Sequence, residues 1–214
     1  MSEADMDSLL TTLFDGDQAR AIAEAKKLLH SGFSRARIVT EGIEVAMTQL
    51  DAKCTVEQFN LLEIMLVGRA AVAVMKEMYP AHLQGYPPKS KGVVVIATLE
   101  GDIHDLGKNI LKMILTAKGY QVVDCGRDCS VEKLIDIAKR EAAMAVGVSG
   151  LITPVIPYVR QIKEMLANRG LGNIKVMAGG GALKQSSAES LNVDFVAETA
   201  FDGVRYLAQI AGTV

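Results

Sequence analysis

From Val93 onward, short apolar runs alternate with amphipathic stretches, and this alternation restricts the possible folds more than any other feature of the chain. Each run has the length and β-branched content of a buried strand, and a helical pattern follows it. The runs are VVVIATL (93–99), QVVDC (121–125), MAVGVS (144–149), IKVMAG (174–179) and DFVA (194–197). The helices are expected at 106–118, 131–140, 155–168, from 183 onward, and at 201–210. Strands that alternate with helices form parallel βαβ units, so residues 92–214 are predicted to form an α/β domain with a doubly wound, five-stranded parallel sheet.

The first 84 residues differ in character and predict four helices that pack as a bundle. The helices are expected at 4–14, 19–30, 38–50 and 56–78. Asp17 and Ser34 are placed to cap the second and third helices, while Thr55 and Gln58 have the spacing of a capping box for the fourth. The two adjacent prolines in QGYPPKSKG then indicate a linker at 85–91, which separates domains at 1–84 and 92–214.

Composition argues against several classes of function. The 214 residues carry a formal net charge of -2, so neither a basic face nor a nucleic-acid partner is expected. The acidic start MSEADMDSLL lacks the apolar core of a signal peptide, and no apolar stretch approaches the ~20 residues of a membrane span. Cys54, Cys125 and Cys129 have no C-x-x-C spacing and are expected to be reduced, buried thiols. We therefore expect a cytoplasmic protein that makes no membrane contact.

The first loop beyond the sheet carries the strongest candidate for chemistry. Ligands of doubly wound sheets bind beyond the carboxyl ends of the strands, so the loops after the first, third and fourth strands are the expected site. In the first loop, Asp102 and His104 stand two residues apart. The carboxylate can accept a proton from one imidazole nitrogen and leave the other nitrogen as a metal ligand of fixed tautomer. The alternative interpretation is a histidine satisfied by hydrogen bonds within its loop.

Small residues mark the other two loops. After the third strand, Ser149 and Thr153 can donate to a ring nitrogen or a phosphate without blocking a slot, although Thr153 before Pro154 is also a common helix cap. After the fourth strand, the glycines at 179–181 permit close backbone approach, or alternatively form a flexible turn. Together the three loops suit a ligand with a large flat head, whose metal His104 holds, and a long tail that the small residues line.

The segments EGDIHDLGKNI and SGLITP resemble the cobalamin-binding module of methionine synthase and the corrinoid methyl-carrier proteins of anaerobic methyltransferase and O-demethylase systems. The resemblance covers nearly the whole chain and implies a four-helix bundle cap followed by a flavodoxin-like (Rossmann-type) sheet. It implies that His104 binds the corrinoid cobalt from below in place of the cofactor's own base, and that Asp102 orients the imidazole. The residues implied to contact the cofactor are Gly101, Asp102, Ile103, His104, Asp105, Gly107, Ser149, Leu151, Thr153, Gly179, Gly180 and Gly181.

One position departs from the methionine synthase pattern. In that pattern a serine two residues after the threonine extends the histidine–aspartate pair, whereas Val155 at the matching position has no hydroxyl. A proton relay through three groups is therefore not expected, although cobalt reduction can still be coupled to protonation of the pair. In the helical half, the resemblance implies a lid over the methyl-bearing face of the corrin, with Phe59, Leu62 and Leu66 as candidates. The alternative is that these are ordinary core residues of the bundle.

The function that the resemblance implies is methyl transport. The implied cofactor is cobalamin or a related corrinoid that alternates between methylcob(III)alamin and cob(I)alamin. The implied partners are a substrate:corrinoid methyltransferase, a second methyltransferase that serves tetrahydrofolate or coenzyme M, and a reductive activase. The chain itself is expected to be a non-catalytic carrier subunit, because the reactive bonds form at the cofactor and the partners complete the catalysis.

Three alternatives stay open from the sequence. The small subunit of an adenosylcobalamin mutase shares the D-x-H-x-x-G motif but normally lacks a preceding helical bundle. A B12-dependent light or ligand sensor pairs the same two domains but usually adds a DNA-binding domain and a tryptophan over the corrin, and this chain has no Trp. A flavin protein or phospho-receiver is the weakest alternative, because SGLITP stands where a receiver carries its phosphorylated aspartate.

Overall fold

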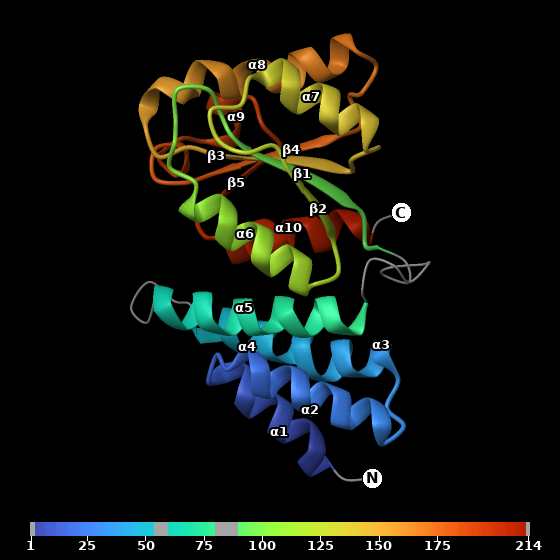
Figure 1. Cartoon of the computed structure of the whole chain (residues 1–214). Helices are drawn as coiled ribbons and strands as arrows, with labels where there is room; N and C mark the ends of the chain where they lie inside the picture. The colour runs from blue at the N-terminus through green and yellow to red at the C-terminus, as the bar shows by residue number, and fades with distance from the viewer. Residues whose placement is uncertain (1–2, 54–59, 80–89, 213–214) are drawn as a thin grey trace. The chain divides into compact units, whose positions relative to one another are not determined.

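The computed structural model describes residues 3–53, 60–79 and 90–212, and it divides into two compact units. The helical unit comprises the residues up to 89 together with 116–119, and the α/β unit comprises the remainder (Figure 1). Most of the predicted linker at 85–91 lies outside the described residues. Within the described ranges, no helix combines the length and the apolar character needed to cross a bilayer.

The helices of the helical unit pack against one another around an apolar core. The elements are α1 (Glu3–Phe14), α2 (Gln18–His30), an unbroken run of α3 (Arg35–Arg37), the π-helical turn η1 (Ile38–Ile43) and α4 (Glu44–Lys53), and finally α5 (Leu61–Met78). Asp17 and Ser34 are N-caps as predicted, because their side chains accept hydrogen bonds from the backbone of Arg20 (3.0 Å) and Arg37 (3.1 Å). The fully buried side chains of this core include Leu9, Leu13, Leu28, Met47, Leu50, Ile64 and Met75.

The start of α5 differs from the prediction. Asn60 has an extended backbone (φ -114°, ψ 95°), and its side chain accepts a hydrogen bond from the Glu63 backbone N–H at 3.1 Å. The predicted helix from Val56 is therefore wrong, because the N-cap residue lies outside the helix that it caps and Asn serves as well as Thr in that role. The predicted capping box of Thr55 and Gln58 lies outside the described residues.

The α/β unit contains a sheet of five parallel strands in the flavodoxin-like order β2-β1-β3-β4-β5, which confirms the predicted fold. The strands are β1 (Val93–Thr98), β2 (Gln121–Asp124), β3 (Ala145–Ser149), β4 (Lys175–Gly179) and β5 (Phe195–Ala197). One face is covered by α7 (Val131–Arg140), α8 (Ile156–Asn168) and the short α9 (Ala188–Leu191), and the other by α6 (Leu106–Ala117) and α10 (Ala200–Ala211) (Figure 1). Because helices cover both faces, β1 is buried along nearly its whole length, which explains its unbroken apolar sequence.

Two single-turn elements lie where the helices after β3 and β4 were predicted to begin. These are η2 (Thr153–Val155), which leads into α8, and η3 (Leu183–Gln185), which precedes α9. Thr153 is the first residue of η2, whose N-cap is Ile152, and the N-cap of α8 is Val155. The interpretation of Thr153 as a helix cap is therefore wrong, and its exposed side chain stays available at the edge of the sheet.

Candidate functional site

The strand register brings the three predicted loops to one edge of the sheet. Thr98 at the end of β1 pairs with Ser149 at the end of β3, and Ser149 pairs in turn with Gly179 at the end of β4. The strands therefore end level with one another, and the loops that follow them emerge side by side. This is the carboxyl edge at which doubly wound sheets bind ligands.

Asp102 is the centre of the hydrogen bonds at this edge. Its carboxylate is fully buried, and Oδ1 accepts hydrogen bonds from the backbone N–H of His104 (2.9 Å) and from His104 Nδ1 (2.7 Å). The other oxygen, Oδ2, accepts from the backbone N–H of Leu151 at 2.7 Å. Leu151 belongs to the S-x-L loop after β3, so one carboxylate joins two of the three loops.

The environment keeps the Asp102 carboxylate ionised. Burial raises the pKa of Asp102, but the hydrogen bonds from His104 and Leu151 outweigh burial and lower that pKa below its ordinary value. An ionised carboxylate can only accept, so His104 Nδ1 carries the donated proton. In the neutral imidazole with this tautomer, the opposite nitrogen, Nε2, has the lone pair that a metal needs.

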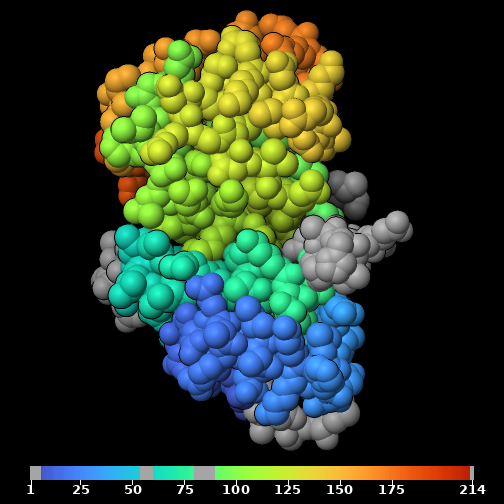
Figure 2. All heavy atoms as spheres, viewed as in Figure 1, coloured from blue at the N-terminus to red at the C-terminus, as the bar shows by residue number. Residues whose placement is uncertain are grey.

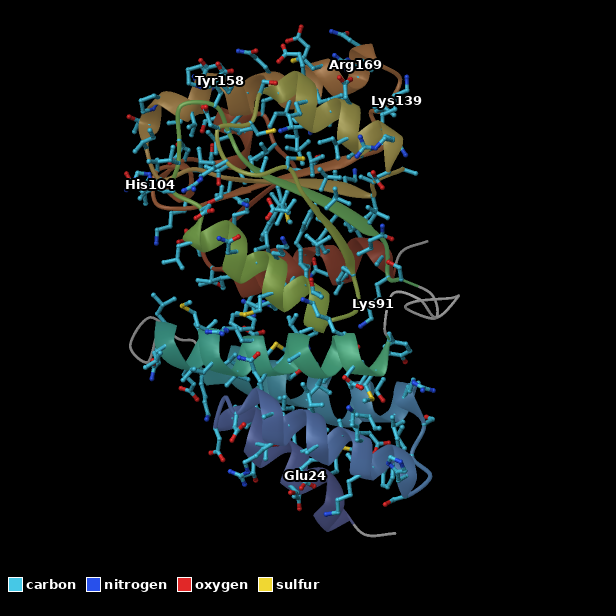
Figure 3. The ribbon with its side chains drawn as sticks, in the orientation of Figure 1. Glu24, Lys91, His104, Lys139, Tyr158 and Arg169 are labelled. Carbon is cyan, nitrogen blue, oxygen red and sulfur yellow. The ribbon has the colours of Figure 1, made fainter. Side chains whose placement is uncertain are left out.

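The His104 side chain faces outward among exposed apolar groups. It is 52% exposed and projects from the loop between β1 and α6 at the margin of the α/β unit (Figure 3). Ile103 (64%) in the same loop, Leu106 (49%) at the start of α6 and Leu151 (51%) in the loop after β3 are also exposed. The green segment that carries the first loop forms part of the surface of the unit (Figure 2). Exposed large apolar side chains around a ligating imidazole suit a broad, flat ligand better than a free ion.

The glycines after β4 allow the second and third loops to pack backbone against backbone. Gly180 has φ +101°, and a Cβ atom built on it would lie 2.6 Å from the carbonyl oxygen of Gly150. The Gly150 N–H donates to the Gly179 carbonyl at 3.0 Å, and the Ala182 N–H donates to the Gly150 carbonyl at 3.2 Å. A Cβ atom on Gly181 would meet the Leu151 side chain at 2.8 Å. These contacts favour the close-approach interpretation of the glycines over a flexible turn.

The remaining site residues of the α/β unit lie around this centre. Gly101 (φ +86°) turns the chain before Asp102, and the Asp105 carbonyl accepts from the Asn109 N–H at the start of α6. A Cβ on Gly107 would have Ser149 Oγ as its near neighbour, at 3.5 Å, so α6 begins beside the half-buried Ser149. Val155 is fully buried, and its side chain lies close beneath Gly150. It supports the S-x-L loop by packing.

A contact that the sequence analysis missed comes from the loop between β2 and α7. Asp128 accepts a hydrogen bond from the Gly101 N–H at 2.9 Å and therefore contacts the histidine-bearing loop from the far side. In the same loop Cys125 and Cys129 are free, buried thiols as predicted, while Cys54 lies outside the described residues. A hydrogen bond between the two thiols lowers the pKa of Cys129 to about 7 and raises that of Cys125.

The lid candidates belong to the helical unit. Leu62 is 65% exposed near the start of α5. Leu66 lies one turn further along α5 and is partly exposed. A Cβ atom built on Gly16 would lie 2.6 Å from the Leu66 Cβ, so Leu66 also packs against Gly16 within the helical unit. Phe59 lies outside the described residues. The description of Leu62 as a core residue of the bundle is therefore wrong, while Leu66 has both exposed and packed surface.

The number of metal-ligating side chains at the site indicates whether it can hold a bare metal ion or a metal-containing cofactor. Within the described residues there is no group of three or more His, Cys, Asp or Glu side chains that could hold a metal ion. A lone imidazole is too few ligands for a bare ion but is the usual protein ligand of a metal already enclosed by a macrocycle. The site therefore fits a planar metallocofactor, and a doubly wound sheet with such a histidine at its carboxyl edge defines a cofactor-binding module rather than a free-metal site.

Comparison with known proteins gives the same class. Residues 92–205 match the B12 binding domain family. A dimethylamine corrinoid protein of Methanosarcina mazei is 31% identical over 199 residues, which cover 92% of this chain and 91% of that protein. A solved cobalamin-binding protein from Desulfitobacterium hafniense has a TM-score of 0.76 at 25% identity and covers 96% of this chain and 98% of its own. The methanol:cobalamin methyltransferase complex of Methanosarcina barkeri includes the same fold, with a TM-score of 0.85 at 23% identity over 100% of this chain and 82% of that one.

The chain belongs to the B12-binding corrinoid proteins. The similarity extends over the helical unit as well as the sheet, because the matched relatives are covered over nearly their whole length.

Proposed function

We propose that this protein carries a methyl group on a corrinoid between two methyltransferases. The single observation that carries the proposal is the bonded pair of Asp102 and His104: Nδ1 of the imidazole lies 2.7 Å from a buried carboxylate, and the imidazole side chain is about half exposed. A corrinoid, when bound, supplies a cobalt centre that accepts and releases the methyl group. The protein supplies the lower ligand, the orientation and the surroundings.

His104 is the proposed lower ligand of cobalt, and Asp102 is the proposed positioning residue. The carboxylate fixes the tautomer and raises the basicity of the imidazole, which strengthens a nitrogen–metal bond. Without a metal on Nε2, the pair of His104 and Asp102 would have the capacity to take up a proton. Val155 provides no hydroxyl to pass that proton further, so the proposed proton store consists of two groups.

The small residues of the other two loops are the proposed slot for the nucleotide tail. Ser149 is half-buried at the end of β3 and Thr153 is exposed beyond it, and their hydroxyls are the proposed polar contacts of the tail. Gly179, Gly180 and Gly181 leave the adjacent backbone without side chains. The exposed groups of Ile103 and Leu151, with Gly101, Asp105 and Gly107, are the proposed contacts beneath the macrocycle.

We further propose the division of labour between the parts of the chain. Residues 92–214 bind the corrinoid, residues 1–84 form the lid over its upper face, and 85–91 is the linker that lets the lid move. The exposed apolar Leu62 suits a surface that must exclude water from a reactive centre. The proposed partners are a substrate:corrinoid methyltransferase, a tetrahydrofolate or coenzyme M methyltransferase, and a reductive activase. The similarity to the dimethylamine corrinoid protein of Methanosarcina mazei supports methyltransferase partners.

Reconstitution with hydroxocobalamin tests the proposal. The full chain is reduced to the cobalt(II) form, and the axial nitrogen splitting is read by electron paramagnetic resonance in protein grown with nitrogen-15 histidine. A change of the splitting with the label identifies a histidine as the lower ligand. His104→Ala is expected to lose that signal, whereas His30→Ala, whose imidazole binds the Lys26 carbonyl in α2, is expected to keep it. A label-dependent signal in His104→Ala would contradict the proposal.

A further inference from the structure

The loop between β2 and α7, residues 125–130, is bonded along its length to the segment that leads from β1 to the histidine. The Thr98 N–H donates to the Gly126 carbonyl at 3.0 Å, and the Cys129 N–H donates to the Thr98 carbonyl at 3.0 Å. The Glu100 N–H donates to the Cys129 carbonyl, also at 3.0 Å. The two segments therefore continue the pairing of β1 and β2 beyond the end of the sheet.

Asp128 ends this series with two hydrogen bonds to consecutive residues of the histidine-bearing loop. Its Oδ1 accepts from the Gly101 N–H at 2.9 Å, and its own N–H donates to the Asp102 carbonyl at 3.2 Å. The Asp102 N–H is already bonded to the Leu99 carbonyl at 3.0 Å. Both backbone polar groups of Asp102 are therefore hydrogen-bonded, the N–H to Leu99 and the carbonyl to Asp128.

The backbone of Asp128 lies in the left-handed region, with φ +52°. A residue with a Cβ atom is strained there, and such strain persists only where the surrounding contacts impose it. Asp and Asn tolerate this region better than other side-chain-bearing residues. The conformation is what lets one residue present both its carboxylate and its N–H to the same neighbouring turn.

The base of the loop is anchored to the helix that follows the histidine. Asp124 Oδ1 accepts from the Gly126 N–H at 2.9 Å and from Lys108 Nζ at 2.5 Å, and Lys108 is only 3% exposed. Lys108 lies in the first turn of α6, four residues after His104. The loop that holds Asp102 is therefore also bonded, through Asp124 and Lys108, to the helix on the other side of His104.

We propose that Asp128 is a positioning residue for the cobalt ligand: it fixes the Gly101–Asp102 backbone, and through the Asp102 carboxylate it sets the direction in which His104 presents Nε2. The role rests on the proposed function, because it concerns the lower ligand of the corrinoid. Asp128 forms these hydrogen bonds with the backbone of Gly101 and Asp102, and not with the His104 imidazole. Its effect passes through the two backbone bonds and the buried carboxylate.

Three substitutions of Asp128 distinguish the contribution of its carboxylate from the contribution of its left-handed backbone conformation. Asp128→Asn keeps an acceptor and tolerates the left-handed region, and Asp128→Gly keeps the conformation but loses the acceptor. Asp128→Ala loses both. Asn192→Ala is the matched control, because Asn192 has φ +53° at the end of α9 and none of its hydrogen bonds reaches the cofactor loops.

The first measurement is amide hydrogen exchange of Gly101 in the full chain without cofactor. Removing the acceptor from this N–H is expected to reduce its protection about tenfold in Asp128→Gly and at least as much in Asp128→Ala. Asp128→Asn and Asn192→Ala are expected to keep the protection of the unaltered chain. Gly101 protection that is unchanged in Asp128→Gly would overturn the proposal, and this result stands even where Asp128→Ala does not fold.

The second measurement is the axial histidine signal of the cobalt(II) corrinoid bound to each variant. Asp128→Gly is expected to lose a substantial part of the histidine-ligated population, while Asp128→Asn and Asn192→Ala keep it. A histidine signal of full intensity in Asp128→Gly overturns the role of Asp128 and leaves the proposed function intact. Absence of the signal in the unaltered chain overturns the proposed function, and the role of Asp128 with it.

Discussion

The Asp102 carboxylate accepts a hydrogen bond from the Leu151 backbone N–H at 2.7 Å, which joins residues 49 positions apart in the chain. The same carboxylate holds the imidazole of His104 through its other oxygen. The loop after β3 therefore takes part in positioning the proposed cobalt ligand through a backbone N–H. A movement of that loop would therefore be transmitted to His104 through the Asp102 carboxylate.

Asp102→Asn is expected to destabilise the protein and to shift the reduction potential of the bound cobalt. An amide has one acceptor oxygen, so its NH₂ group would face an N–H donor in place of a bond. A buried donor left without a partner costs about 1–3 kcal/mol, and the imidazole loses the charge that strengthened it as a ligand. Urea unfolding of the chain without cofactor measures the first effect, and a spectroscopic redox titration measures the second. Glu100→Gln, an exposed neighbour, is expected to change neither.

Lys108→Met is expected to lower the free energy of unfolding by about 3 kcal/mol, because it leaves the Asp124 carboxylate without its buried cation. Lys108 is almost fully buried, whereas Lys112, which binds the other oxygen of Asp124 at 3.1 Å, is about half exposed. Lys112→Met is therefore the matched control and is expected to cost about 0.5 kcal/mol. The free energies of unfolding are measured by urea unfolding at neutral pH. Equal decreases in the two variants would show that the buried Lys108–Asp124 pair stabilises the fold no more than the exposed Lys112–Asp124 pair does.

The same pair predicts a loss of stability in acid. Burial raises the pKa of Asp124, but its hydrogen bonds, above all that from Lys108, outweigh burial and lower the pKa below the ordinary 3.8. A carboxyl group whose folded pKa is the lower one stabilises the fold above its unfolded pKa, and this contribution disappears as the pH falls through the folded value. The stability difference between the unaltered chain and Lys108→Met is therefore expected to be constant above about pH 5 and to shrink below about pH 4. A difference that stays constant down to pH 2 would assign the loss to packing.

The part of the structure that could be predicted from sequence is the part that local patterns specify. The bounds of α7 match the prediction because Ser130 caps one end and an amphipathic pattern continues to Arg140. The start of α5 could not be placed, because Asn60 and Thr55 are both good caps and local preference does not choose between them. The same holds for the site: local patterns predicted some of its residues and could not predict others. Asp102 and His104 lie in one short motif, whereas Asp128 reaches Gly101 only because β2 lies beside β1, and no local pattern in the sequence specifies that contact.

Leu62→Ala is expected to leave stability nearly unchanged and to speed the photolysis of the bound methylated corrinoid. Leu62 is largely exposed, so its truncation should alter the free energy of unfolding by less than about 0.5 kcal/mol. The proposed lid, however, would lose apolar cover over the methyl group. Thr11→Ala, an exposed change on α1, controls for any substitution on the surface of the helical unit. The photolysis rate is followed by absorbance under fixed illumination, and equal rates in the two variants would remove Leu62 from the lid.

Gly180→Ala is expected to destabilise the α/β unit by about 3 kcal/mol and to weaken corrinoid binding. Two costs add here: the left-handed φ of +101°, and a Cβ atom placed 2.6 Å from the Gly150 carbonyl oxygen in the neighbouring loop. Gly170→Ala isolates the first cost, because Gly170 has φ +71° and no heavy atom within 4 Å of a built Cβ, and it is expected to lose only about 1 kcal/mol. Unfolding measurements on both variants, with cobalamin uptake followed by absorbance, separate backbone strain from the loss of close packing. If both variants lost the same stability and bound the corrinoid equally, the contact between the loops after β3 and β4 would have no part in forming the slot.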